Sequence, residues 1–277
     1  MYKILLVLLL TVTTQLLAFS DYDMDGVEDK KDLCPNTPFN ALVDINGCSK
    51  KTLKNFHISS ITLQHFDIIA GINYSQTSYD NLDNSDTYSG SLQVDYYYKK
   101  FSIQASTSYY DSHSVSYNDS GLTDSFLGAY YTFTPLLNLD VRVGGGAIIP
   151  TYKSELSNNN TDYTASLSLS YMLHEKISLF CGYNYVIVND DDTKDVKYQN
   201  TNSYNFGAGF YPTQKLYLSG SYNSSDSIYT GIKDINTLSF YGYYTINKNW
   251  FGTLNYAYGL SDTASDNYFS LRIGYYF

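Results

Sequence analysis

The sequence predicts an all-β protein, a transmembrane antiparallel β-barrel of about twelve strands that follows a small N-terminal module. Three observations predict it: aromatic residues make up 17% of the 277 residues, charged residues make up only 16%, and apolar and small polar residues alternate along the chain. A period of two places alternate side chains on opposite faces of a strand. Strands with one apolar and one polar face are typical of a wall between lipid and water.

The first segment, residues 1–20, has the pattern of a secretory signal peptide. Lys3 supplies a positive charge, Ile4 to Leu10 form an apolar core, and Ala18-Phe19-Ser20 is a small-x-small cleavage site. The apolar core is too short for a membrane-spanning helix, which is the alternative interpretation. The net charge of −10 argues against nucleic acid as a partner, because phosphate binding needs clusters of Lys and Arg.

The second segment, residues 21–50, opens with regularly spaced carboxylates. If Asp21 is position 1, carboxylates fall at positions 1, 3, 5, 9 and 12 and a glycine at position 6, as in a calcium loop of the EF-hand kind. Alternate side chains in a tight loop converge on one centre, where Ca²⁺ takes oxygen ligands. The predicted Ca²⁺ ligands are Asp21, Asp23, Asp25, the carbonyl of Val27, Asp29 and Asp32. The alternative is a solvated acidic linker.

Two cysteines, Cys34 and Cys48, lie close together in this exported segment. A disulfide between them is expected in an oxidising compartment, with two free thiols as the alternative. The aspartate run, the Cys34-Pro35-Asn36-Thr37-Pro38 sequence and the later Val43-Asp44-Ile45-Asn46-Gly47-Cys48 sequence together resemble the thrombospondin type 3 repeat. The resemblance implies calcium binding by the aspartates and a Cys34–Cys48 bridge.

Residues 51–65 are expected to form a linker, and residues 66–277 the barrel. For Asn55–His65, a periplasmic tether and an extension of the first strand are the alternatives. Short connections such as Lys99-Lys100 alternate with longer ones such as Asp111–Leu122, as in barrels with periplasmic turns and external loops. An even strand count places both termini on the periplasmic side, and the calcium module with them. The alternative is a soluble β-sandwich. The predicted strands are 66–77, 87–98, 101–110, 123–133, 139–149, 161–171, 177–188, 202–211, 216–224, 236–245, 250–260 and 267–277.

The last predicted strand has the clearest alternation. Phe269, Leu271, Ile273, Tyr275 and Phe277 share one face, and small or polar residues share the other. An apolar face that ends in a terminal aromatic residue resembles the C-terminal β-signal of bacterial outer-membrane barrels. The resemblance implies the outer membrane of a Gram-negative bacterium, contact with its lipids, and recognition of Phe277 by the barrel assembly machinery.

The inward faces of the predicted strands carry mostly serine, threonine and glutamine, with few charges. Parity places five charged residues inward, including both arginines of the protein: Asp67, Asp95, Asp140, Arg142 and Arg272. They are predicted to form a constriction or an ion-pair network in the lumen. The alternative is that ion pairs only connect neighbouring strands. Asp67, Asp95 and Arg272 are expected to be neighbours where the barrel closes.

A small, polar lumen favours an outer-membrane channel for passive diffusion of small solutes. The alternatives are a structural or adhesion barrel that transports nothing, and an outer-membrane lipid hydrolase. The chain has four histidines, His57, His65, His113 and His174, and no G-x-S-x-G sequence. Hydrolysis needs a nucleophile, a base and an oxyanion site in register, so the sequence predicts that the protein is not an enzyme.

Overall fold

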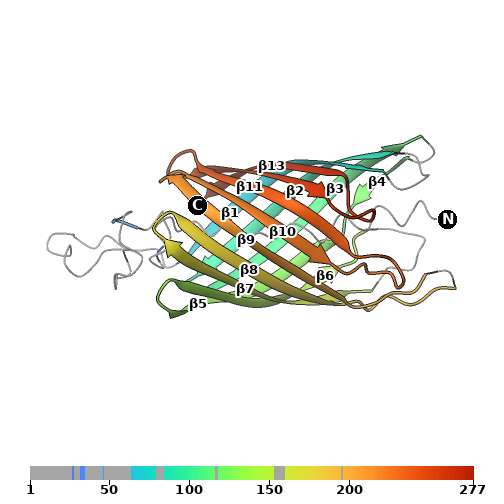
Figure 1. Cartoon of the computed structure of the whole chain (residues 1–277), viewed down its shortest axis with the longest axis horizontal. Helices are drawn as coiled ribbons and strands as arrows, with labels where there is room; N and C mark the ends of the chain where they lie inside the picture. Colours follow the sequence, from blue (N-terminus) through green and yellow to red (C-terminus); the bar gives the residue numbers. More distant parts are fainter. Residues whose placement is uncertain are drawn as a thin grey trace.

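A closed antiparallel β-barrel accounts for nearly all of the chain that the structure describes (Figure 1). The structure is a computed structural model, and it describes Val27, residues 32–34, Asn46, and residues 64–78, 84–115, 118–152, 160–194 and 196–277. Within these residues, no helix is long and apolar enough to span a bilayer.

The barrel wall is built from thirteen strands, each hydrogen-bonded to its neighbours in an antiparallel register. They are β1 (Gln64–Thr77), β2 (Ser85–Tyr98), β3 (Phe101–Ser114), β4 (Asn118–Leu122), β5 (Ser125–Leu136), β6 (Leu139–Ile149), β7 (Asp162–His174), β8 (Ile177–Ile187), β9 (Thr201–Thr213), β10 (Leu216–Ser225), β11 (Ile235–Thr245), β12 (Trp250–Gly259) and β13 (Asn267–Tyr276).

Two pairings establish that the barrel is closed and has twelve positions. β1 pairs with β13 on one side and with β2 on the other, so the first and last strands seal the wall. β4 and β5 both pair with β3, one beyond the other, and together fill a single position. Closure leaves no unpaired strand edge facing lipid, which is the condition for a sheet that spans a membrane. The predicted all-β barrel of about twelve strands is confirmed.

The strand bounds differ from the prediction mainly at one hairpin. Asp111–Leu122 was expected to be a loop, and this was wrong, because β3 continues to Ser114 and β4 pairs with its end. The hairpin therefore rises past the apolar part of the wall. Its inner and outer faces are both polar there, so alternation of apolar residues gave no sign of a strand. β1 also begins two residues early, at Gln64.

The short turns and the chain terminus lie at one end of the barrel, on the left in Figure 1. Lys99 and Asn138, in the β2–β3 and β5–β6 turns, have φ of 54° and 68°, a conformation that tight two-residue turns require. The Phe277 amide donates to the carbonyl of Phe66 over 2.9 Å, so the terminus is tied to β1. The chain thus enters β1 and leaves β13 at the short-turn end.

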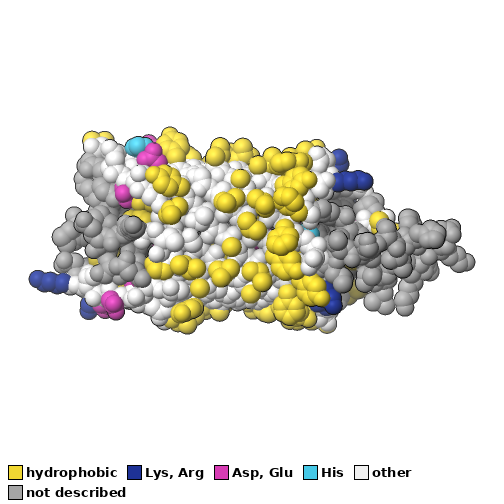
Figure 2. Space-filling view, turned by 180° about the vertical axis from the view of Figure 1, so that it is seen from behind, with side chains coloured by type: hydrophobic (Ala, Val, Ile, Leu, Met, Phe, Trp, Pro, Cys, Tyr) yellow, Lys and Arg dark blue, Asp and Glu magenta, His cyan; other side chains and the backbone are white. Residues whose placement is uncertain are grey.

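The outer face of the barrel is apolar between two polar ends (Figure 2). Alternate residues of every long strand present exposed aliphatic or aromatic side chains, as Ile68, Leu167 and Leu271 do. Aromatic pairs on this face mark both edges of the apolar zone. Phe66–Tyr96, Phe101–Tyr131 and Trp250–Tyr275 lie near the short turns, and Tyr74–Tyr88, Tyr183–Tyr204 and Phe206–Tyr222 lie near the long loops. Such girdles mark the two membrane interfaces.

Candidate functional site in the barrel lumen

The inner wall toward the long loops is lined with small hydroxyl and amide side chains. They bond to each other across strands: Asn223 donates to Ser239 over 2.8 Å, and Asn73 donates to Ser89 over 3.0 Å. The inward positions of β7 to β10 carry mostly serine, threonine, asparagine and glycine, with Phe180 and Val186 among them. A wall of this kind is uncharged and wettable, because hydroxyl and amide groups exchange hydrogen bonds with water at little cost.

The inner wall near the short turns carries larger, aromatic side chains. Tyr243 and Tyr276 share a hydrogen bond of 2.8 Å between their hydroxyl groups, and Phe251 stacks on Tyr276 with ring centroids 4.7 Å apart. On the next strands, His65 stacks on Tyr97 at 4.4 Å. These aromatic rings project from the wall into the lumen at the short-turn end and narrow it there.

Arg272 on β13 reaches across the neighbouring strand to β2. Its guanidinium donates to the side-chain carbonyl of Gln93 over 3.4 Å, and the Gln93 amide donates to Asp95 over 2.8 Å. Gly71 on β1 makes this possible, because a Cβ there would lie 2.6 Å from Cγ of Arg272 and 2.9 Å from Oγ of Ser91. A side chain at position 71 would therefore displace the arginine.

Arg142 on β6 also reaches across a strand, toward β3. Its guanidinium lies 4.1 Å from the ring centroid of Tyr130 on β5 and donates to Oγ of Ser102 over 3.1 Å. A guanidinium over a tyrosine face is an attractive cation–π contact. Gly144 leaves the space in which the Tyr130 ring lies, since a Cβ there would overlap that ring.

The two arginines act on the same carboxylate, Asp95. Asp95 is buried on β2, with Asp67 opposite it on β1 and Gln104 opposite it on β3. Asp67 also lies 3.7 Å from His65. Two arginines and two aspartates therefore share one part of the inner wall.

The structure brings four of the five predicted lumenal charges together and leaves one apart. Asp140 lies at the short-turn end of β6, where it accepts a hydrogen bond of 2.6 Å from Thr134. Three polar side chains complete the group: Gln93, Ser102 and Gln104, which were predicted to face the lumen but not to belong to the charged group. Their inward parity was readable from the sequence, but uncharged residues of this kind line the whole wall and gave no reason to single them out.

Gln104 is the most buried of these polar side chains, with 1% of its surface exposed. Neither its side-chain oxygen nor its nitrogen has a hydrogen-bond partner in the described part of the chain. An unpaired buried amide is costly, on the order of 1–3 kcal/mol, unless water or another group pairs with it. The charged group therefore includes a side-chain amide with which no group of the described wall forms a hydrogen bond.

The predicted calcium loop lies mostly outside the described residues, as Asp21, Asp23, Asp25 and Asp29 do, and so does Cys48. Of the predicted ligands, Val27 and Asp32 are described. Asp32 is buried, and its carboxylate accepts the backbone amide of Cys34 over 2.7 Å. The Leu33 amide donates to the Asn46 carbonyl over 2.9 Å. The loop, the Cys34–Cys48 bridge, the signal peptide and the linker remain predictions.

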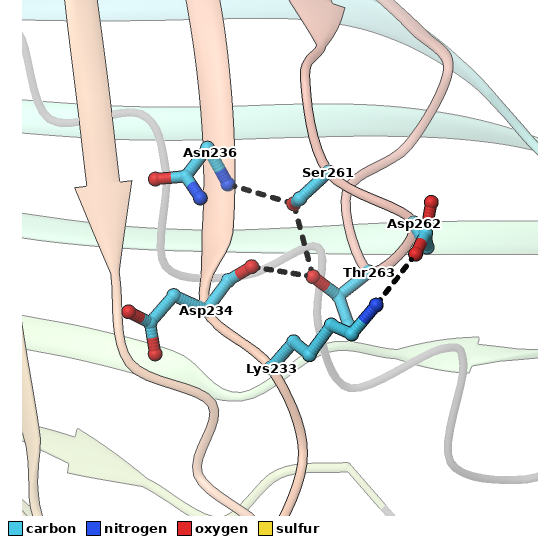
Figure 3. A network of polar contacts seen from close by, with 6 residues as sticks. All are labelled: Lys233, Asp234, Asn236, Ser261, Asp262 and Thr263. Carbon is cyan, nitrogen blue, oxygen red and sulfur yellow. Dashed lines mark hydrogen bonds and ion pairs between the residues drawn. The ribbon is translucent and has the colours of Figure 1, made fainter.

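The loops at the other end of the barrel are held by polar contacts (Figure 3). Thr263 donates to the Asp234 carbonyl over 2.6 Å, and the Asn236 amide donates to Ser261 over 3.0 Å, which joins the β12–β13 loop to the start of β11. Lys233 and Asp262 form an exposed ion pair of 2.9 Å. Exposed pairs contribute little to stability, so the hydroxyl and backbone contacts hold these loops.

The histidines in the described residues lie in different parts of the barrel. His65 is stacked on Tyr97, and His174 is exposed at a short turn. His113, on the outer face of β3, lies 3.1 Å from Asp111 and 3.3 Å from the Asn118 side chain. Neither neighbour is a hydroxyl or thiol nucleophile. His57 lies outside the described residues. Cys181 is exposed on the outer face of β8 as a free thiol.

A closed barrel with an apolar outside and a polar inside defines a membrane-spanning β-barrel. No family model and no curated protein matches the sequence. Among solved structures, an outer membrane channel from Pseudomonas putida F1 is similar with a TM-score of 0.68 and 10% identity, over 79% of this chain and 97% of that chain. The KdgM porin (TM-score 0.49, 11% identity, 74% and 98% covered) and the NanC porin (0.46, 15%, 76% and 98%) are also similar.

The likeness to the Pseudomonas putida channel is one of fold, because 10% of the residues are identical. It spans almost all of that chain and about four fifths of this one. The chain therefore has the fold of an outer-membrane channel, and its residues differ from those of that channel at most positions. What passes through the lumen has to be argued from this chain's own inner wall.

Proposed function

We propose that this protein is an outer-membrane channel for the passive diffusion of small solutes. The observation that carries the proposal is the inner wall toward the long loops, where β7 to β10 present mostly serine, threonine, asparagine and glycine. A twelve-stranded barrel has more interior than such short side chains fill, so water occupies the rest.

Liposome swelling tests this function directly. Purified protein in liposomes is expected to admit glycerol and then pentoses and hexoses at decreasing rates, since friction with the wall grows with solute size. An outward-face variant such as Ile68→Leu serves as the control, because it leaves the lumen unchanged. Vesicles that swell no faster than protein-free vesicles would exclude a channel and favour a barrel with a structural or adhesive role.

We further propose that Asp67, Asp95, Arg142 and Arg272, with Asp140 nearer the periplasmic rim, set the ion selectivity. The two arginines oppose the two buried aspartates, so the wild-type channel should discriminate weakly between anions and cations. Arg272→Gln or Arg142→Gln leaves the carboxylates in excess and should move the reversal potential toward cation selectivity. Unchanged selectivity and conductance in both variants would leave these pairs with only the role of connecting strands.

The N-terminal module is proposed to bind one Ca²⁺ ion in the periplasm, through Asp21, Asp23, Asp25, the Val27 carbonyl, Asp29 and Asp32. The entry of the chain at the short-turn end supports that location, and the buried Asp32 carboxylate supports a folded module. Calcium titration of the full chain should give one site, which Asp23→Asn with Asp25→Asn abolishes. Asp44→Asn, an acidic residue outside the ligand set, is the matched control. Equal calcium affinity in both variants would contradict the site.

Three further predictions belong to this proposal: cleavage after Ser20, the Cys34–Cys48 disulfide, and recognition of Phe277 by the barrel assembly machinery. Phe277 is exposed and packs edge-on against Tyr275 at 4.8 Å, so its ring is available to a partner on the outer face. Phe277→Ala should lower the amount of folded barrel in the membrane, measured as the heat-modifiable band on a gel, without lowering the stability of protein refolded in detergent.

A further inference from the structure

A cavity of about 140 Å³ lies within the lumen against the inner faces of β1, β2 and β3. Most of its lining side chains carry a hydroxyl or an amide, and Tyr268 and Arg272 border it from β13. A cavity needs roughly 10–15 Å³ for each water molecule. By that measure it holds about ten waters, or one solute with about a dozen non-hydrogen atoms.

One hydroxyl in this lining is left unpaired by the wall. Ser75 on β1 is 3% exposed, and its Oγ has no hydrogen-bond partner among the described residues. A buried hydroxyl without a partner is costly, by about 1–3 kcal/mol, so the position favours a group that can pair with it. A water molecule or a ligand hydroxyl in the cavity meets that need.

The rest of the lining offers a positioned ring and further polar groups. The Tyr268 hydroxyl donates to the Asn73 side-chain oxygen over 3.3 Å, and Asn73 in turn donates to Ser89, so the ring of Tyr268 is held in place. Arg272 uses one guanidinium donor on Gln93 among the described side chains. Its charge is opposed by Asp95, so the cavity offers donors without a strong net field.

We propose that this cavity binds a neutral polyhydroxylated solute, a monosaccharide or polyol of hexose size, on its way through the lumen. Ser75, Asn73 and Arg272 exchange hydrogen bonds with its hydroxyl groups, and the Tyr268 ring meets its less polar face. Small ligand sites combine such an aromatic surface with a few placed polar groups. The assignment rests on the proposed channel function and names the class of solute that the channel selects.

Equilibrium binding of glucose to the detergent-purified full chain, followed by saturation-transfer NMR, tests the proposal without needing a conducting pore. Wild-type protein should bind glucose saturably. Ser75→Ala should weaken binding about three- to tenfold, the range for one lost neutral hydrogen bond. Ser75→Leu should abolish it by filling the cavity. Ser168→Leu is the matched control, since Ser168 faces the lumen from β7 outside this cavity.

A heat-modifiable gel band shows whether each variant is folded. If Ser75→Leu does not fold, Ser75→Ala still tests the proposal. Equal glucose affinity in wild type and the Ser75 variants would overturn the proposal, as would an absence of saturable binding. Preference for gluconate over glucose would also overturn it, because Arg272 would then be an anion site. Binding without liposome swelling would reject the channel and leave the site intact, and swelling without binding would do the reverse.

Discussion

Two glycines determine where the lumenal arginines lie. Gly71 and Gly144 leave room for Arg272 and for the Tyr130 ring under Arg142, so that both guanidinium groups extend past the strand next to their own. The sequence predicted that the charges point inward, because parity alone decides the face of a strand. It could not predict their partners, since reach across a neighbouring strand depends on the register and on the absence of a Cβ at particular positions.

Gly71→Ala should displace Arg272 and break its hydrogen bond to Gln93. The cost is expected to be about 1–3 kcal/mol, the usual range for adding volume to a packed position. The ion selectivity should shift less than in Arg272→Gln, because the displaced arginine keeps its charge in the lumen. Gly90→Ala is the control, because nothing lies within 4 Å of a Cβ there. Denaturant unfolding in detergent measures the stability of both. Equal stability and selectivity in the two variants would contradict the role given to Gly71.

A carboxyl in the external β8–β9 loop gives a pH dependence. Burial and the neighbouring charge of Asp191 raise the pKa of Asp190. The hydrogen bond from the Asn160 amide stabilises the carboxylate and lowers this pKa, but it does not cancel the rise. Because the folded state holds this proton more tightly than the unfolded state, this group favours folding at low pH. Its contribution is lost as the pH rises from the ordinary aspartate range through the raised pKa.

Asp190→Asn should therefore reduce the fall in loop stability with rising pH. The rate of hydrogen exchange of the backbone amides at 196–200 measures this stability. The ratio of the variant's rate to the wild-type rate at each pH cancels the pH dependence of the intrinsic exchange rate. Asp192→Asn is the comparison, since it removes a charge from the same loop at a residue that binds the Tyr198 amide instead. An identical ratio at all pH values would show that Asp190 does not titrate with folding.

At the scale of the strand, alternation was a reliable guide wherever one face meets lipid. β6, β7 and β11 to β13 fall within two or three residues of their predicted bounds. The β3–β4 hairpin was missed because Asp111, His113 and Ser114 lie beyond the apolar zone. Both faces of a strand meet water there, so apolar and polar residues no longer alternate. The extent of a strand outside the membrane is set by backbone pairing, and a single sequence does not display that pairing.

Adjacent residues in the middle of β7 test the two faces of the wall. Leu167 and Ser168 are both exposed, but alternation points Leu167 to lipid and Ser168 to the lumen. Leu167→Arg should destabilise the folded barrel by about 2–4 kcal/mol, the cost of a guanidinium at the lipid midplane. Ser168→Arg should cost far less and make the channel more anion-selective. Unfolding in lipid vesicles measures both, and the opposite ranking would mean that the faces are reversed.

At the scale of the whole molecule, the sequence predicts the fold better than it predicts how side chains are arranged in the lumen. Closure through β1 and β13 and the apolar belt could be predicted from the sequence, because lipid leaves few alternatives. The convergence of Arg142 and Arg272 on Asp95 and the cavity beside Ser75 required the three-dimensional register. The fold therefore indicates insertion into a membrane, and the proposed solute class rests on the inner wall.

The central claim is that the lumen conducts. Planar-bilayer recording of the purified barrel in potassium chloride tests it most directly. Discrete, stable steps of current with weak ion selectivity, shifted toward cations by Arg272→Gln and unchanged by the outward Ile68→Leu, are the predicted result. A correctly folded barrel that inserts into the bilayer but passes no current, with or without the arginine, would contradict the account.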